Sequence, residues 1–72
     1  MLIKSVLLDA LEARYESQIA EADAIVKIYL ENSVGIGEHP QHIEEMDKLV
    51  GQIASAEDNL KALNKYFNNT QI

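Results

Sequence analysis

The sequence predicts an all-α fold, an antiparallel hairpin of two long helices that self-associates as a four-helix bundle or a similar coiled-coil assembly. Hydrophobic residues recur at alternating spacings of three and four on both sides of a single break, which is typical of helices packed side by side. The break holds two of the three glycines and the only proline of the 72 residues. The series before it is Leu8, Leu11, Tyr15, Gln18, Ala22, Ile25, Tyr29, and the series after it is Met46, Leu49, Ile53, Ala56, Leu60, Leu63, Phe67.

The first helix is predicted at about residues 5–31. Ser5 is a good capping residue, and the segment that follows is rich in strong helix formers and free of Gly and Pro. Asn32, which tolerates the left-handed conformation, precedes the glycines and marks the end. Gln18 interrupts the hydrophobic series. Either it fixes register or oligomeric state, or Ile19 replaces it at the inward position through a small stutter.

A loop at 32–39 leads to a second helix at about 40–67 and a tail at 68–72. Pro40 suits the first helical position, where a missing N–H costs nothing. Glu44 and Glu45 then place negative charge at the positive end of the helix dipole. Gly51 costs roughly 1 kcal/mol relative to alanine inside the helix. It either admits a neighbouring helix closely or is simply tolerated.

The hydrophobic faces are wider than a lone hairpin needs, which indicates further helical neighbours. A chain this small usually needs an additional source of stability, and the absence of cysteine excludes disulfides and thiolate zinc sites. We therefore expect a homo-oligomer, with a dimer favoured. The predicted core and oligomer interface comprises Leu8, Leu11, Ile25, Met46, Leu49, Ile53, Leu60, Leu63 and Phe67.

The net charge of −6, from twelve acidic and six basic residues, argues against direct binding of nucleic acid or of an anionic membrane surface. The longest acidic run is Glu44-Glu45, whereas mimics of nucleic acid carry dense acidic runs. The apolar start of the chain is ended by Asp9 and Glu12, too early for a membrane span. We expect a cytoplasmic protein, in the host cytoplasm if it is viral.

The loop is where chemistry would concentrate. Glu38, His39, His42 and Glu45 bring two imidazoles and two carboxylates near the start of the second helix, a possible but weak metal site. The competing interpretation is that His39 caps the helix while His42 and Glu45 are solvated. No Glu-x-x-His element occurs, no nucleophile has a matching base, and no cofactor or enzymatic activity is expected. The predicted loop contacts are Val34, Gly35, Ile36, Gly37, His39 and Pro40.

Two runs, Val34 to Gln41 (VGIGEHPQ) and Ile53 to Asp58 (IASAED), resemble short hypothetical proteins of tailed phages, especially phages of marine bacteria. The resemblance covers most of the chain. It implies a viral or marine origin and brings no catalytic residues. We expect a non-catalytic accessory protein that acts as an oligomeric helical interaction module toward a host or phage protein. The alternatives are a metal-binding helical bundle and an acidic inhibitor that mimics nucleic acid.

Overall fold

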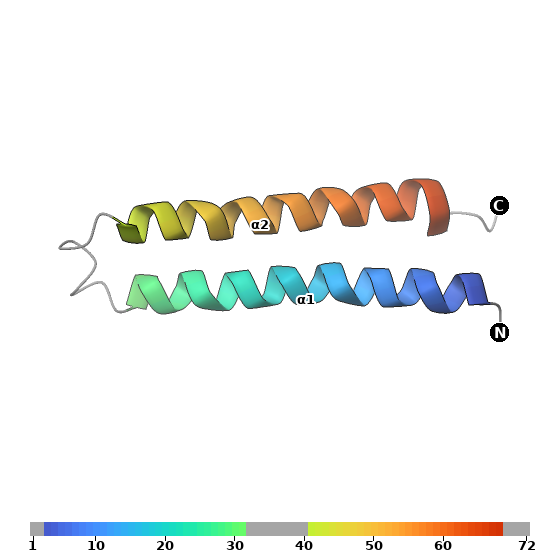
Figure 1. Ribbon diagram of the computed structural model, residues 1–72, viewed down its shortest axis with the longest axis horizontal. Helices are drawn as coiled ribbons and strands as arrows, with labels where there is room; N and C mark the ends of the chain where they lie inside the picture. The colour runs from blue at the N-terminus through green and yellow to red at the C-terminus, as the bar shows by residue number, and fades with distance from the viewer. Residues whose placement is uncertain (1–2, 32–40, 69–72) are drawn as a thin grey trace.

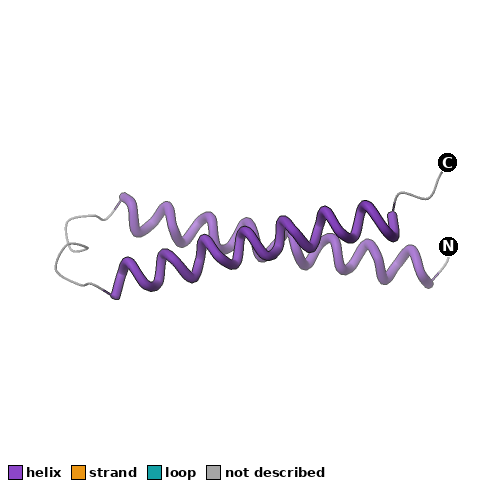
Figure 2. The backbone as a smooth tube through the Cα atoms, turned by 90° about the horizontal axis from the view of Figure 1, so that it is seen from above, coloured by secondary structure: helices purple, strands orange, loops and turns teal. Residues whose placement is uncertain are grey.

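The computed structural model describes residues 3–31 and 41–68 and confirms the predicted antiparallel helical hairpin. Helix α1 spans Ile3–Glu31, and helix α2 spans Gln41–Leu63 and continues as a π-helical segment, η2, at Asn64–Asn68. The two helices run side by side, so that the start of α1 and the end of α2 lie at the same end (Figure 1). They cross at a shallow angle (Figure 2), which is the geometry of coiled-coil packing. Self-association stays a prediction.

The helix ends differ slightly from those predicted. Helix α1 begins at Ile3, two residues before Ser5, and ends at Glu31 as expected. Helix α2 is described from Gln41, while Pro40 lies outside the described residues. Glu44 lies in its first turn and Lys61 in its last turn, which matches both ends of the helix dipole. The wider turn of η2 was not foreseen, and it rotates the side chains that follow Leu63 relative to a regular α-helix.

The core of the hairpin is thin. Ala22 and Ala56 are each 1% exposed, and Leu63 is 5% exposed; they are the buried hydrophobic residues of the described chain. The small alanine side chains allow the two backbones to approach closely. Most of the predicted core is only half-buried, because a hairpin covers each helix on one side: Leu8, Ile25, Met46, Leu49, Ile53 and Leu60. Leu11 and Phe67 are exposed, at 38% and 53%.

The molecule is a rod of 53 × 18 × 15 Å with a radius of gyration of 16.3 Å. A compact domain of this length would have a radius of about 11 Å. The accessible surface is 5699 Å², against about 4,500 Å² for a compact monomer of this mass. The hairpin therefore leaves roughly 1,200 Å² more surface in solvent than a typical folded chain.

Much of that surface is apolar. Nine large hydrophobic side chains of the described residues are exposed: Val6, Leu7, Leu11, Ile28, Leu30, Ile43, Val50, Tyr66 and Phe67. Neither α1 nor α2, as described, contains an apolar stretch long enough to cross a membrane.

Candidate interaction surface

Two long faces flank the line along which α1 and α2 meet. Residues seven apart share a face of a coiled-coil helix, so each face is made of columns at that spacing. We call the first the hollowed face, because two depressions in the surface lie on it. Its columns are Leu7, Arg14, Glu21, Ile28 and Lys4, Leu11, Gln18, Ile25 on α1, with Lys48, Ser55, Ala62 and Glu45, Gln52, Asn59 on α2.

The central hollow lies halfway along the rod and is polar. It has a volume of about 660 Å³ and is lined by Gln18, Glu21, Lys48, Gly51, Gln52 and Ser55. A Cβ atom placed on Gly51 would meet nothing within 4 Å, so the missing side chain leaves open space. Gln18 and Ile19 are both half-buried, and Gln18 turns to this hollow. Neither residue displaces the other from the seam.

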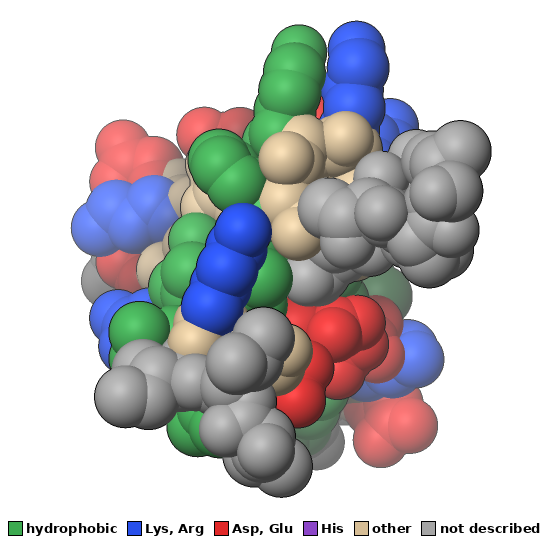
Figure 3. Space-filling view, turned by 90° about the vertical axis from the view of Figure 1, so that its right-hand side faces the viewer, with side chains coloured by type: hydrophobic (Ala, Val, Ile, Leu, Met, Phe, Trp, Pro, Cys, Tyr) green, Lys and Arg blue, Asp and Glu red, His purple; other side chains and the backbone are tan. Residues whose placement is uncertain are grey.

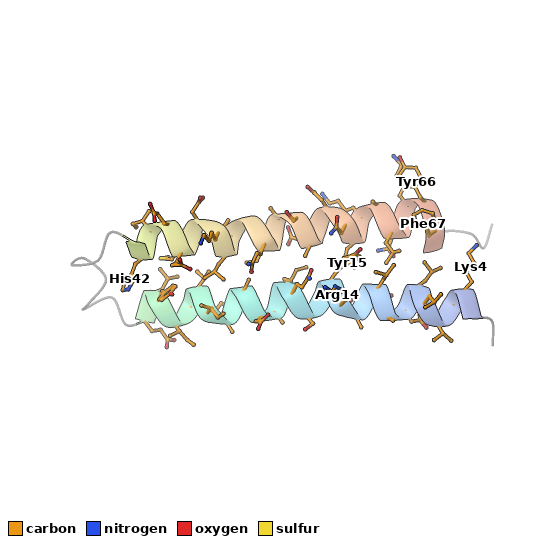
Figure 4. All side chains as sticks on the ribbon, in the orientation of Figure 1. Lys4, Arg14, Tyr15, His42, Tyr66 and Phe67 are labelled. Carbon is orange, nitrogen blue, oxygen red and sulfur yellow. The ribbon has the colours of Figure 1, made fainter. Side chains whose placement is uncertain are left out.

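The end hollow lies toward the start of α1 and is largely apolar. It has a volume of about 370 Å³ and is lined by Leu8, Leu11, Tyr15, Asn59, Ala62, Leu63 and Phe67. Because η2 rotates the last turn, Phe67 joins the rim of this hollow while it stays exposed. Its neighbour Tyr66 points away from α1 (Figure 4). The Lys65 ammonium lies over the Tyr66 ring, 5.2 Å from the ring centre.

The opposite side is the acidic face, and it has two different halves. Toward the start of α1 it holds Asp9, Glu12, Glu16 and, from α2, Glu57. Toward the turn it carries Asp23 among hydrophobic residues: Ile19, Val26, Leu30, Ile43, Met46, Val50 and Ile53. The end view in Figure 3 shows carboxylates gathered on one flank of α1 and hydrophobic side chains on the other flank. Asp23 forms an ion pair with Lys27 at 2.9 Å.

The charges of the hollowed face are mixed. Arg14 and Lys48 lie on it with Glu21, and the ammonium of Lys48 is 3.6 Å from a carboxylate oxygen of Glu45. Both partners of this pair are largely exposed, so the pair adds little to folding stability. The hollowed face therefore carries both signs of charge, and the acidic face carries almost only one.

An aromatic contact closes the hairpin at the turn. The rings of Tyr29 and His42 stack with centroids 5.3 Å apart and planes inclined by 22°. His42 points toward α1 in Figure 4 and is half-buried. Neither interpretation drawn from the sequence, a metal ligand or a solvated side chain, placed His42 in this contact. The missed signal was spacing, because His42 precedes Leu49, Ala56 and Leu63 in steps of seven and so belongs to the inward column of α2.

The four metal-ligand candidates are not brought together in what the structure describes. His42 stacks on Tyr29, and Glu45 faces Lys48. Glu38 and His39 lie outside the described residues, as do the other predicted loop contacts. Within residues 3–31 and 41–68, no group of three or more potential ligands is positioned to hold a metal ion.

The Tyr29–His42 stack is expected to couple the two helices energetically. In a double-mutant cycle with Tyr29→Leu and His42→Leu, we expect an interaction free energy of about 0.5–1.5 kcal/mol from chemical denaturation. The pair Tyr15→Leu and His42→Leu serves as a control, since these residues lie far apart along the rod and should give additive effects. A Tyr29–His42 coupling no larger than that of the control would show that the stack adds nothing to stability.

Comparison with models of known protein families, with curated proteins and with solved structures finds no match.

Proposed function

We propose that this chain is a non-catalytic oligomeric interaction module: a helical hairpin that packs against further copies of itself, with a dimer favoured. The observation that carries the proposal is the imbalance between its core and its surface. Three hydrophobic residues are buried in the described chain, while nine large hydrophobic side chains are exposed. A rod with so thin a core gains most by covering its sides with other helices.

The exposed apolar side chains favour a protein contact over other uses. Leu7 and Ile28 share one heptad column of α1, and Ile43 and Val50 share one of α2, so a further helix can meet each pair along one face. We propose further that the module serves as an accessory protein of phage origin and binds a host or phage protein. The resemblance of its loop sequence to short phage proteins supports this second part.

The test of self-association is the mass of the native particle over a range of concentrations. We expect sedimentation velocity and native mass spectrometry to give twice the chain mass of 8.1 kDa, or a higher multiple of it, at micromolar concentrations. Dilution should shift the population toward single chains, because assembly follows mass action. A particle of one chain mass at all concentrations up to hundreds of micromolar would overturn the proposal.

A further inference from the structure

We infer that a second copy packs on the hollowed face, with both hairpins pointing the same way, so that their turns lie at one end of a four-helix bundle. This inference rests on the proposed self-association and adds to it the face, the direction and the register. It follows from matching the levels of residues along the rod.

The Tyr29–His42 stack shows which residues of α1 and α2 lie at the same height along the rod, and we call this height the level of a residue. Because the helices are antiparallel, it places Ala22 level with Leu49, Tyr15 with Ala56, and Leu8 with Leu63. When two hairpins face each other in the same direction, α1 of each lies over α2 of the other at these same levels. Every neighbouring pair of helices is then antiparallel.

The apolar residues match in this arrangement. Leu7 is 61% exposed, and the levels of Leu7 and Leu11 lie on either side of Ala62. On the second copy these two leucines therefore lie over the end hollow, whose rim includes Ala62 and Phe67. The small side chain of Ala62 leaves space for a leucine. The two-fold symmetry repeats this contact, so both end hollows are filled.

The polar residues match as well. Glu21 of one copy is level with Gly51 and close to the level of Lys48 of the other, which places opposite charges side by side. Gln18 lies level with Gln52 and Ser55, which have the donors and acceptors to bond with its amide. The open space beside Gly51 admits a side chain of the second copy.

The other arrangements make different contacts. If the second hairpin is reversed on the same face, α1 lies over α1 and α2 over α2 of the other copy, which brings Glu21 near Arg14 instead of Lys48 and takes Leu7 and Leu11 away from the end hollow. If the acidic faces meet in parallel, the carboxylates of Asp9, Glu12, Glu16 and Glu57 from two copies come together. Like charges placed together disfavour the contact between acidic faces.

The chain exposes roughly 1,200 Å² more than a compact monomer, and a standard interface buries about 800 Å² on each partner. The hollowed face runs the length of a 53 Å rod. Covering it leaves the acidic face, with its apolar half near the turn, in solvent.

The first experiment exchanges the charges of Glu21 and Lys48. Homodimers of Glu21→Lys contain two Lys–Lys contacts, and homodimers of Lys48→Glu contain two Glu–Glu contacts. We expect each variant alone to dimerise about tenfold more weakly than the original chain. An equimolar mixture should form heterodimers with near-original affinity, because each contact then joins opposite charges. Glu57→Lys is the matched control on the acidic face and should not weaken the dimer.

The second experiment reads the direction through cysteine pairs, for which the cysteine-free chain gives a clean background. A mixture of Glu21→Cys and Lys48→Cys chains should form a disulfide-linked heterodimer under mild oxidation. A mixture of Glu21→Cys and Arg14→Cys chains reports the reversed arrangement, in which α1 lies over α1, and should stay unlinked.

The outcomes separate the two proposals. A monomeric original chain overturns the proposed self-association, and this inference falls with it. An oligomer that links Glu21→Cys to Arg14→Cys, or that links neither pair and shows no heterodimer preference after charge exchange, overturns the inference and leaves self-association standing. Preferential heterodimers together with the Glu21–Lys48 link support both.

Discussion

Replacing Leu63 with aspartate is expected to unfold the hairpin. Leu63 is the one large hydrophobic side chain that is buried in the described residues. Losing its packing costs about 2–5 kcal/mol, and the desolvation of a carboxylate adds to that. A single core in so small a chain supplies only about 3–5 kcal/mol. The mean residue ellipticity at 222 nm should therefore fall to that of an unfolded chain.

The matched control is Val50→Asp, which places the same charge on the same helix. Val50 is 54% exposed, so its aspartate stays hydrated and the hairpin should keep its helical signal. A Leu63→Asp chain that remains as helical as the Val50→Asp chain would show that the contact between α1 and the end of α2 is not needed for folding.

Enlarging Ala56 to leucine is expected to destabilise the protein by about 1–3 kcal/mol, because the added atoms overpack a closely packed contact. Ala56 is 1% exposed and lies level with Tyr15 of the opposite helix in the register set by the Tyr29–His42 stack. The two helices must move apart to admit the larger side chain. Urea denaturation monitored by circular dichroism measures the loss of unfolding free energy.

Ala54→Leu is the control for this substitution. Ala54 is an exposed alanine two positions away on the same helix, so its replacement changes the intrinsic helix propensity equally without crowding the seam. We expect its unfolding free energy to stay within about 0.5 kcal/mol of the original. Equal stability of the Ala56→Leu and Ala54→Leu variants would mean that the helices have space between them at Ala56.

The fold was largely predictable because one periodic signal governs it. Hydrophobic residues at spacings of three and four define two helices, and the glycines and proline between them define one break. The buried residues Ala22, Ala56 and Leu63 are all members of the predicted series. Helix α1 begins two residues before the predicted cap Ser5, because Ser5 lies inside its first turn.

The candidate site was less predictable, because it depends on how two helices face each other. Tyr29 and His42 are separated by the turn, and only the antiparallel register brings their rings together. Phe67 fits the heptad series, yet η2 turns it to the rim of the end hollow. The division into a mixed-charge face and an acidic face also needs the register, since charges are spread evenly along the sequence.

The antiparallel register also orders the contacts by the length of chain that each one closes. Tyr29 and His42 close a loop of 13 residues, whereas Leu8 and Leu63, at the opposite end, close one of 55 residues. The longer closure costs about 1.3 kcal/mol more in chain entropy. The contacts between the two helices should thus form in order from the turn toward the termini during folding, and break in the reverse order. The end hollow is then the last region to form and the first to open. A second copy bound there would stabilise the contacts that break first and so slow unfolding.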